Sequence, residues 1–493
     1  MKSKMFKKLM AAVIATTMTA SLAACDNGGN ASSSASGSGE SKTPASSQDA
    51  TPASSDTASS EEDLGGYTPL KDANGNVYNL GGMEIVIRDW WSPEEPAAPQ
   101  DDYEEETLKY RNWIQETYNF KIKQVAISDW GSAPQDFVDY VSTQGDENNY
   151  VFTLRNSAEL IAAMSTGLCY DLSTLDCLDF STPKFTNNLL HKQFSKGGKI
   201  FAMYAGYSEP RTGIYFNKRL LQDAGVDPES LYDMQKAGTW TWDAFIDLCD
   251  KVQRDTDNDG AIDVYACNCN NGLLTEAAVY SNGGEFVGQD ASGKYVYKLE
   301  DANTIEGLNY AKRIFDNSWE VEPEGAAWDY YKEGFINGEY VFMFEQAYAG
   351  QSQGFLADME DKWGFVMFPK GPKMNDYTNL WDNNPVCIPA CYDPQRAWNI
   401  AFAWNLYTND TPGYEDSDAW KTGYYNGYSD TRSVDETLAM MRTKGMITYH
   451  GIIPNLNFGP ELTWNIGPNT APISEVISGI ADTWKAYIDD ANK

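Results

Sequence analysis

The sequence predicts an α/β fold in which two domains follow an export signal and a polar tether. Three observations support this prediction. Strand-like and helix-like hydrophobic patterns alternate along the chain, as they do in proteins whose helices cover a β-sheet. Aromatic and apolar residues are concentrated in residues 67–493, which is long enough for two hydrophobic cores. The residues before this region form a short apolar segment followed by a stretch of small and polar residues.

Residues 1–24 have the pattern of a cleavable export signal. Four lysines precede Leu9–Leu22, which carries no charge and is too short and too weakly apolar for a membrane span. Ala23 and Ala24 then place small residues before Cys25, whose thiol can accept a diacylglycerol. This ending resembles the lipobox of bacterial lipoproteins, although a plain signal with an accidental cysteine has the same outline. We expect lipidation at Cys25 and export to the outer face of the cell membrane, with the lipid as the only membrane contact.

Residues 25–66 begin with this cysteine and continue as a tether. The tether is rich in Ser, Ala, Gly, Thr and Pro, so it cannot bury enough apolar surface to fold. A flexible coil of about 40 residues has a root-mean-square reach of roughly 35 Å. The tether would therefore hold a folded domain away from the membrane, and its composition favours a Gram-positive surface over a periplasm.

The chain is strongly acidic, with a formal net charge of −34. A charge of this sign repels polyanions, so we exclude nucleic acid as a partner. For the same reason we do not expect an anionic membrane surface or a sugar acid as the main partner. The simpler explanation of the charge is that it keeps an exported protein soluble.

Seven of the eight cysteines follow the tether, and their spacing does not form a disulfide framework. Cys249 lies on the apolar face of a predicted helix, so we expect it in the core. The pairs Cys267/Cys269 and Cys387/Cys391 have spacings that a metal could use. The chain has only two histidines to complete such a site, and we therefore do not expect zinc.

The first elements of the folded region follow one another closely. Met83–Ile87 alternates apolar and charged residues and predicts a strand. Residues 110–117 carry apolar side chains at helical spacing, and Phe120–Ile122 alternates with lysine and predicts a second strand. Val151–Leu154 predicts a third strand.

Similar patterns continue in the second half of the chain. Thr241 predicts the N-cap of a helix over residues 242–252, whose apolar side chains recur at i, i+3, i+4 and i+7. Thr275–Ser281 predicts a helix that ends at an Asn-Gly-Gly turn. Val341–Phe344 and Gly364–Phe368 predict buried strands. Helices between strands over this length predict sheets with mainly parallel pairing.

Six short segments between residues 198 and 372 stand out as motifs. They are GKIFAMY (Gly198–Tyr204), IYFNKRLLQDAGV (Ile214–Val226), TWTWDAF (Thr239–Phe245), NGG (Asn282–Gly284), FINGEYVFM (Phe335–Met343) and WGFVMFPKGP (Trp363–Pro372). In this order, they resemble motifs of the extracellular solute-binding proteins of the maltose-binding type (family 1). Each match is weak alone, but their order and spacing are specific and cover most of residues 80–490, with the C-terminal third matched least.

The resemblance implies a two-lobed, periplasmic-binding-protein-like fold of type II, with the ligand cleft between the lobes. Lobe 1 would comprise residues 82–207 and 379–411, and lobe 2 would comprise residues 208–378 and 412–493. The resemblance also implies a monomeric receptor that closes around a solute by hinge motion and delivers it to the permease of an ABC importer. We expect the solute to be a carbohydrate, most simply an oligosaccharide.

We expect the ligand to contact the ends of strands and the two places where the chain crosses between the lobes, near Tyr207–Arg211 and Lys373–Pro385. Open α/β sheets bind ligands at the carboxyl ends of their strands. Sugars need flat aromatic faces and planar polar groups. The resemblance places Tyr348 where the family carries an aromatic platform. The candidate ligand-binding residues are Trp91, Arg155, Asn156, Tyr207, Arg211, Asn271, Glu345, Tyr348, Trp381 and Asp382.

Each aromatic candidate has the alternative of packing in the core, and the same alternatives apply to Trp90, Trp130 and Trp328. Trp240 and Trp242 flank the start of a helix, so we expect them in the core. For the two arginine candidates, the alternative is a surface salt bridge.

Residues 255–263, with the sequence DTDNDGAID, form the sharpest local motif. Ca²⁺ loops carry oxygen ligands at positions 1, 3, 5 and 9, a glycine at position 6 and a carbonyl ligand at position 7. Ala266 stands where an EF-hand has its glutamate, so water or another residue would complete a structural calcium site. The alternative is an acidic, solvated turn. The predicted ligands are Asp255, Asp257, Asp259, the carbonyl of Ala261, and Asp263.

Catalytic motifs are missing from the sequence, which has no phosphate-binding glycine loop, nucleophile elbow or HExxH motif. We therefore expect a receptor and not an enzyme. Two rival functions remain open. A lipid-anchored glycoside hydrolase would need two carboxyls facing one sugar bond, and Glu285 and Glu345 are the pair to test. A surface receptor or adhesin would bind a carbohydrate without feeding a transporter.

Overall fold

The computed structural model describes residues 66–93, 98–99, 101–415 and 418–493. These residues fall within one compact unit, Asp63–Lys493. Cys25, the predicted export signal and nearly all of the predicted tether lie outside the described residues. Among the residues that are described, no helix has both the length and the apolar character needed to cross a membrane.

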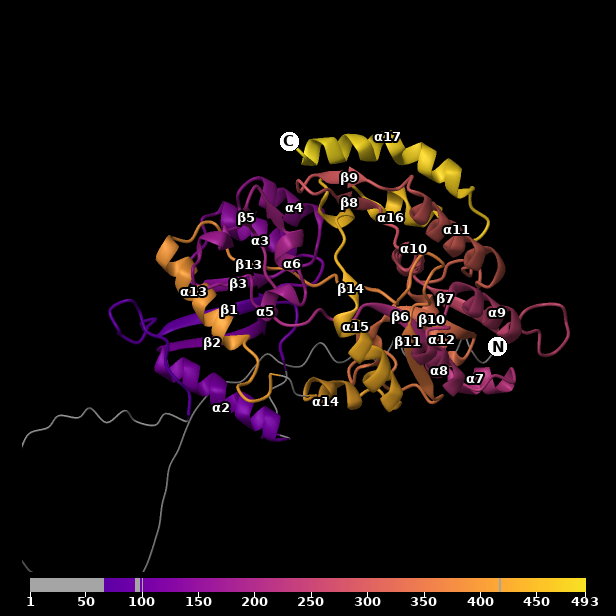
Figure 1. Cartoon of the computed structure of the whole chain (residues 1–493), viewed down its shortest axis with the longest axis horizontal. Helices are drawn as coiled ribbons and strands as arrows, with labels where there is room; N and C mark the ends of the chain where they lie inside the picture. The colour runs from indigo at the N-terminus through magenta and orange to yellow at the C-terminus, as the bar shows by residue number, and fades with distance from the viewer. Residues whose placement is uncertain (1–65, 94–97, 100, 416–417) are drawn as a thin grey trace, which may run out of the picture. The chain divides into compact units, whose positions relative to one another are not determined.

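The first lobe is built on a four-stranded sheet with the order β13-β3-β1-β2. Strand β1 pairs in parallel with both β2 and β3, whereas β13 is antiparallel to β3. Figure 1 shows this sheet with its helices around it, in indigo and magenta with α13 in orange. The strands are β1 (Met83–Asp89), β2 (Phe120–Ala126), β3 (Asn149–Thr153) and β13 (Val386–Cys387). The other elements are α2 (Asp102–Thr117), α3 (Ala133–Ser142), α4 (Ala158–Ser165), α5 (Pro183–Thr186), α6 (Leu190–Gln193), β4 (Ser195–Lys196), β5 (Lys199–Ile200) and α13 (Pro394–Tyr407).

The local chemistry of the first lobe explains why the predicted elements form. Ile85 and Ile87 of β1 are buried while the residues between them are more exposed, which confirms the predicted alternation. Asp101 caps α2 by accepting a hydrogen bond from the backbone N–H of Glu104, at 2.8 Å. One turn apart on the same helix face, Tyr110 and Ile114 pack into the core.

The second lobe is built on a four-stranded sheet with the order β11-β6-β10-β7. Its central strands β6 and β10 are almost entirely buried, because helices and loops cover both faces. The strands are β6 (Thr212–Asn217), β7 (Tyr265–Cys269), β10 (Tyr340–Gln346) and β11 (Trp363–Met367). The helices are α7 (Lys218–Asp223), α8 (Glu229–Ala237), α9 (Trp242–Val252), α10 (Asn271–Tyr280), α11 (Ala302–Asn317) and α12 (Tyr330–Asn337), and a hairpin joins β8 (Val287–Gln289) to β9 (Tyr295–Tyr297).

Two predicted helices of this lobe are confirmed. Thr241 caps α9 by accepting from the backbone N–H of Ala244 at 3.4 Å, and Cys249 is fully buried on its apolar face. Helix α10 ends at the Asn-Gly-Gly turn as predicted, but it begins four residues earlier than Thr275. The reason is that the Asn270 side chain accepts from the backbone N–H of Gly272 and caps the helix there.

The prediction of mainly parallel pairing is wrong, because the two large sheets are mixed. Strand β6 is antiparallel to both of its neighbours, β10 and β11, and β13 is antiparallel to β3. Both β6 and β13 enter their sheets directly after the chain crosses from the other lobe. A parallel pair requires a crossover connection within one sheet, and these strands have none.

The second crossing lies between two short strands. Strand β12 (Asn379–Leu380) pairs in parallel with β14 (Gly445–Met446), and Leu380 belongs to the core of the second lobe. The next strand, β13, pairs with β3 of the first lobe. The chain therefore passes between the lobes over residues 381–385.

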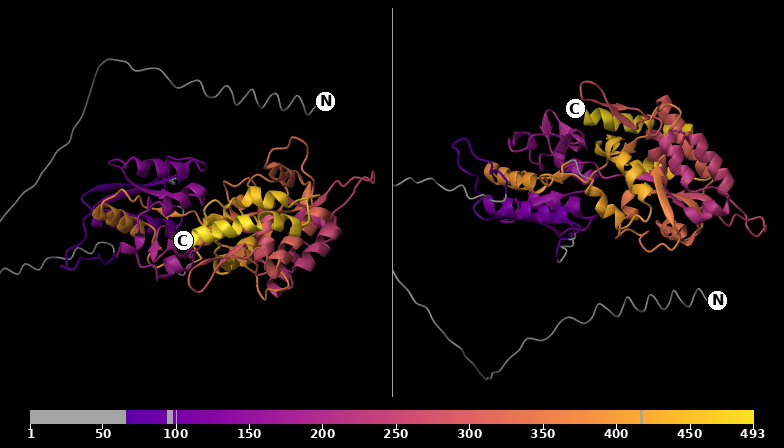
Figure 2. Two further views of the ribbon diagram at one scale, coloured as in Figure 1. Left: turned by 90° about the horizontal axis from the view of Figure 1, so that it is seen from above. Right: turned by 60° about the horizontal axis from the view of Figure 1, so that its bottom comes forward.

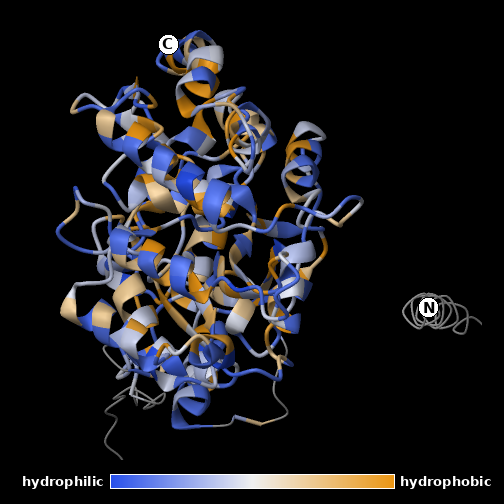
Figure 3. Ribbon diagram, turned by 90° about the vertical axis from the view of Figure 1, so that its right-hand side faces the viewer, coloured by the Kyte–Doolittle hydropathy of each residue, from blue (hydrophilic) through white to orange (hydrophobic). Residues whose placement is uncertain are grey.

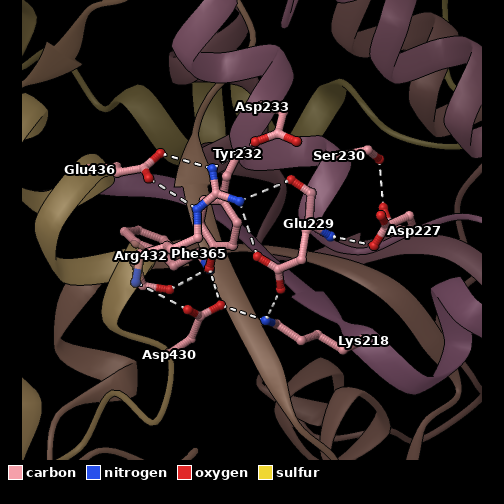
Figure 4. A network of polar contacts seen from close by, with 11 residues as sticks. Lys218, Asp227, Glu229, Ser230, Tyr232, Asp233, Phe365, Asp430, Arg432 and Glu436 are labelled. Atoms are coloured by element: carbon pink, nitrogen blue, oxygen red, sulfur yellow. Dashed lines mark hydrogen bonds and ion pairs between the residues drawn. The ribbon is translucent and has the colours of Figure 1, made fainter.

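The C-terminal region belongs mainly to the second lobe. Arg432 forms ion pairs with Glu229 at 3.1 Å and Asp233 at 2.9 Å on α8, and with Glu436 at 3.0 Å. Figure 4 shows this network, in which Lys218 also pairs with Glu229. The C-terminal elements are α14 (Trp420–Tyr425), a π-helix (Ser433–Leu438), α15 (Ala439–Thr443), α16 (Phe458–Glu461) and α17 (Ile473–Ala491).

The last helix, α17, packs against both lobes. Trp484 belongs to the core of the second lobe, whereas Ile488 packs in a cluster that includes Phe152 of β3. Near its end, the carbonyl oxygen of Ala491 accepts from the Lys196 ammonium of β4 at 3.1 Å. Figures 1 and 2 show α17, in yellow, extending from the second lobe to the first. In Figure 3, hydrophobic and hydrophilic residues alternate along this helix, as expected for one buried face.

Candidate functional site

The first crossing is held in place by one fully buried asparagine. The side-chain amide of Asn188 donates to three backbone carbonyl oxygens, those of Lys184 at 3.1 Å, Tyr204 at 3.1 Å and Gly206 at 2.8 Å. Gly206 has a φ of +82°, a conformation that favours glycine. The path of the chain into the crossing is therefore fixed by the first lobe.

Arg211 follows on the second-lobe side of this crossing. Its guanidinium donates to the side-chain oxygen of Gln346 at 2.7 Å and lies 3.8 Å from the carboxylate of Glu209. Tyr348, just beyond β10, lies within electrostatic range of Arg211 and is 38% exposed. Arg211 and Tyr348 are both sequence-predicted ligand residues, and the structure brings them together.

The second crossing is tied to the first by Asn383. Its side-chain oxygen accepts from the Ser208 hydroxyl at 3.1 Å and from the backbone N–H of Glu209 at 3.0 Å. Asp382, the preceding residue, therefore lies beside the first crossing. The positive charge of Arg211 lowers the pKa of the Asp382 carboxyl, so these two predicted residues also lie in one site.

Asp382 is enclosed by protein and yet reachable by solvent. Desolvation raises the pKa of its carboxyl, Arg211 and His450 oppose the rise, and Glu276 reinforces it. Its side chain is nevertheless exposed, and it makes no hydrogen bond or ion pair with other described residues. A desolvated carboxylate that is also exposed and unpaired can accept hydrogen bonds from a bound solute.

Arg442, which the sequence analysis missed, lies between two aromatic rings. Its guanidinium carbon is 4.1 Å from the ring centre of Tyr207 and 4.2 Å from that of Trp420. Among the described residues it makes no hydrogen bond or ion pair, and burial lowers its pKa. Tyr424 connects Arg442 to the first crossing, because Arg442 lowers and Glu209 raises the pKa of its hydroxyl. The family resemblance could not indicate Arg442, because it is weakest in the C-terminal third of the chain. Only the residues next to Arg442 in the sequence could have pointed to it.

These residues form what we term the crossing cluster: Tyr207, Arg211, Tyr348, Asp382 and Arg442. They come from both crossings, from the end of β10 and from α15. Tyr207 is 40% exposed, so together with Tyr348 it offers accessible aromatic surface. The cluster combines flat apolar faces with planar polar groups, which is the combination that binds hydroxylated solutes.

Three predicted ligand residues lie at the carboxyl edge of the first sheet. Trp91, after β1, is 52% exposed. Arg155, after β3, lies over the Trp130 ring at 5.0 Å and donates to the Trp130 carbonyl oxygen at 3.2 Å. Asn156 packs against Gly451, where an added Cβ would come within 2.4 Å of its amide nitrogen. Arg155 therefore packs against Trp130, and its charge also lowers the pKa of Glu159.

The remaining predicted residues have packing partners of their own. Asn271 opens α10 and donates to the carbonyl oxygen of Ile466 at 3.3 Å. Trp381 is 9% exposed, and its indole covers Gly445, where an added Cβ would lie 2.1 Å from the indole nitrogen.

Glu285 and Glu345 occupy different surroundings. Glu345 is 3% exposed and accepts from the Tyr331 hydroxyl and the Gln346 backbone N–H, both at 2.8 Å. Desolvation raises the pKa of both carboxyls, but Lys298 acts on Glu285 and Lys332 acts on Glu345. The two carboxyls therefore have different charged neighbours, and Glu345 is already committed to two hydrogen bonds.

The acidic loop brings three of its predicted metal ligands together. Carboxylate oxygens of Asp255, Asp257 and Asp263 lie within 4.8 Å of one another. Hydrogen bonds from the Thr256 hydroxyl and N–H hold the pKa of Asp263 below its usual range. The Asp259 carboxylate is outside this group and accepts from the Ala261 N–H at 2.8 Å.

Comparison with known structures identifies proteins that share this fold. A cyclic α-maltosyl-1,6-maltose binding protein from Arthrobacter globiformis superposes with a TM-score of 0.58 at 14% identity, over 83% of this chain and 100% of that one. UgpB from Mycobacterium tuberculosis, in complex with glycerophosphocholine, gives 0.55 at 16% identity over 83% and 100%. The GacH receptor of Streptomyces glaucescens, studied with acarbose, gives 0.53 at 15% identity over 83% and 99%. These similarities confirm the predicted two-lobed α/β fold.

Sequence comparison identifies the family. None of the curated protein sequences compared with the chain matches it. The sequence profile described as bacterial extracellular solute-binding protein matches residues 112–427, well over half of the chain. That match confirms the resemblance read from the motifs, and the chain therefore belongs to the bacterial extracellular solute-binding proteins.

Proposed function

We propose that this protein captures an oligosaccharide at the crossing cluster and delivers it to the permease of an ABC importer. The observation that carries the proposal is Arg442, which is held between Tyr207 and Trp420 and makes no hydrogen bond or ion pair with other described residues, while Asp410 and Asp418 act on its charge at longer range. A guanidinium covered on both faces keeps its N–H edge free and oriented, which suits paired hydroxyls. The A. globiformis protein binds cyclic α-maltosyl-1,6-maltose and the S. glaucescens receptor binds acarbose, which supports the same solute class here.

The members of the crossing cluster would make different kinds of contact with the sugar. Tyr207 and Tyr348 would stack against the apolar faces of sugar rings. Arg211 and Arg442 would donate hydrogen bonds, and Asp382 would accept them from hydroxyls. The other sequence-predicted ligand residues remain candidates for further contacts with a longer saccharide.

Binding would act through hinge closure. Because the cluster takes residues from both crossings and from the second lobe, a solute there contacts the segments that change direction when the lobes move. The solute would favour the closed form by its additional contacts in that form. Lipid on Cys25 would keep the monomeric receptor near the permease.

The test is a calorimetric screen of the full chain against neutral oligosaccharides, sugar acids, glycerophosphodiesters and peptides. We expect a neutral oligosaccharide to bind and to be recovered unchanged. Binding confined to peptides or glycerophosphodiesters would contradict the carbohydrate assignment and leave the receptor function intact. Cleavage of the bound sugar would instead support the enzyme alternative.

We also propose a structural Ca²⁺ ion in the acidic loop. Asp255, Asp257 and Asp263 would hold it, with the carbonyl of Ala261 and, after rotation of its side chain, Asp259 completing the oxygen ligands. The converging carboxylates support the fit, because like charges at this distance repel unless a cation neutralises them. The ion would brace the connection between α9 and β7.

Chelation tests the calcium proposal. At a Ca²⁺ concentration 100-fold above Kd, binding stabilises the folded chain by about 2.7 kcal/mol, so the melting temperature should rise by a few degrees. Asp257→Asn should abolish the response. Asp290→Asn is the matched control, since Asp290 lies in another exposed acidic turn. A melting curve that is the same in calcium and in excess chelator would exclude the ion.

A further inference from the structure

The acidic loop leaves and re-enters the core through a short ladder. Arg254 and Val264 pair as an antiparallel bridge, with hydrogen bonds of 3.0 Å from each N–H to the other's carbonyl oxygen. Before this ladder comes the last turn of α9, and after it comes β7. The segment therefore has the layout of a stem and a loop, with its stem anchored in the second-lobe core.

Two cysteines face each other at the buried end of this stem. The Sγ atom of Cys249, on α9, lies 3.9 Å from the Sγ atom of Cys267, on β7. Both side chains are fully buried. The sulfurs are close to van der Waals contact, and a disulfide would require them to approach to about 2.05 Å.

We propose that Cys249 and Cys267 form a disulfide bond as the exported chain folds. The bond would join the helix to the strand and enclose the acidic loop within a short covalent ring. It would remove conformational freedom from the unfolded segment between the two cysteines, which is how disulfides stabilise small loops. Exported proteins fold where thiols are oxidised, and the family of this chain is extracellular.

The chemistry is a two-step thiol–disulfide exchange with an oxidant of the disulfide class, such as glutathione disulfide or an exported oxidoreductase. The Cys249 thiolate attacks one sulfur of the oxidant and releases its partner as a thiolate. The Cys267 thiolate then attacks the mixed disulfide at Cys249, forms the new bond and releases the second thiolate. Two electrons pass to the oxidant, and the two protein thiols give up their protons to solvent.

The exchange would take place while the chain folds and not in the folded protein. Burial raises the pKa of the Cys249 thiol well above its usual value, so the folded core disfavours the attacking thiolate. The partly folded chain leaves both thiols accessible. Once formed, the bond would be shielded from reductants by the same core.

Cys269 provides an internal control. It lies two residues farther along β7, is also buried, and has its sulfur 3.0 Å from the carbonyl oxygen of Asn270, with no cysteine sulfur recorded beside it among the described residues. Like Cys267 it is buried, at 4% against 0% exposed, but it has no thiol neighbour among the residues described. A bond at Cys267 and not at Cys269 would therefore reflect geometry and not burial alone.

The experiment is peptide mapping of the full chain, exported from a host with an oxidising extracellular compartment and alkylated with iodoacetamide under denaturing conditions without reductant. We expect one linked peptide that contains Cys249 and Cys267, lighter than the reduced pair by two hydrogen atoms. Refolding the reduced chain in a glutathione redox buffer should give the same linkage. In Cys267→Ser the Cys249 thiol should become alkylated, whereas Cys269→Ser should keep the link.

A second measurement keeps the outcome decisive if a variant folds poorly. The wild-type chain refolded from the reduced state, with reductant kept present and without alkylation, should have a lower melting temperature than the oxidised chain. Alkylation of both Cys249 and Cys267 in the exported and the refolded protein would overturn the proposal. A bond from either residue to a different cysteine would overturn it as well.

Discussion

At the scale of single residues, the crossing cluster shows how a charged group can be held by aromatic rings, with carboxylates acting on it only at longer range. Arg442 lies between the rings of Tyr207 and Trp420, at 4.1 and 4.2 Å, and not against a carboxylate. Cation–π contacts hold the guanidinium plane while its N–H groups stay unpaired. Arg432, by contrast, has its N–H groups committed to three carboxylates. The first arrangement leaves donors free for a solute, and the second serves stability.

Arg442→Gln should therefore weaken solute binding without unfolding the protein. Hydrogen bonds to a charged group contribute about 1.5–3 kcal/mol, so we expect Kd to rise by about 10- to 100-fold. Calorimetry with the saccharide found in the screen measures this change. Arg432→Gln is the matched control, and it should lower the melting temperature and leave Kd unchanged. An unaltered Kd in Arg442→Gln would remove Arg442 from the binding site.

Asp382 should make solute binding depend on pH. Its pKa is raised above the usual aspartate value by desolvation, so the carboxyl takes up a proton at a higher pH than an ordinary aspartate does. A protonated carboxyl is a poorer acceptor, and affinity should therefore be highest at neutral pH and fall as pH decreases through this raised pKa. Calorimetry from pH 7 downwards tests the trend. Asp382→Asn should bind weakly and lose this pH dependence, and a wild-type affinity that does not change with pH would argue against the role.

At the scale of elements, the sequence could predict what local patterns determine. The strand at Met83, the Thr241 cap and the end of α10 follow from alternation, capping chemistry and a glycine turn, and all three are confirmed. The direction of β6 and β13 could not be predicted in this way, because it depends on where the chain returns from the other lobe. Arg442 was missed for a similar reason. Its partner Tyr207 is distant in sequence, and the spacing between Trp420 and Arg442 matches no motif.

Helix α9 offers a clear test of predicted core packing. Trp242 is 6% exposed, stacks on Tyr310 with ring centres 4.0 Å apart, and donates its indole N–H to the Ser281 hydroxyl at 3.0 Å. Trp242→Ala should cost about 3–5 kcal/mol of unfolding free energy, measured by urea denaturation. Trp328→Ala should change it by no more than about 0.5 kcal/mol, since Trp328 is 72% exposed. Equal effects of the two substitutions would contradict the assignment of Trp242 to the core.

At the scale of the whole folded unit, the lobes are joined by passages of the chain and by α17. Asn383 ties two of these passages together, and a further passage leads from α13 in the first lobe to α14 in the second. The end of α17 contacts Lys196 of the first lobe while Trp484 remains in the second-lobe core. Any closing motion must bend the chain at these places, because they are the contacts that a rigid rotation would otherwise break.

Hinge closure predicts a more compact unit in the presence of solute. Small-angle scattering should record a smaller radius of gyration when saturating saccharide is added. The Arg442→Gln variant, at a saccharide concentration that saturates only the wild type, should remain closer to the unliganded value. A radius that is unchanged at proven saturation would exclude large-scale closure as the mechanism.

The antiparallel pairing of β13 with β3 also has a consequence for how the chain reaches its folded state. Until β13 arrives, β3 is the outer strand of its sheet, with one row of backbone groups unpaired. More than two hundred residues separate the two strands, and the whole second-lobe sheet lies between them in the chain. A polypeptide that emerges from its N-terminus therefore cannot complete the first lobe before most of the second has emerged. The first-lobe sheet is therefore the earliest sheet to begin to emerge, and its β3 edge is among the last strand edges to be protected from aggregation.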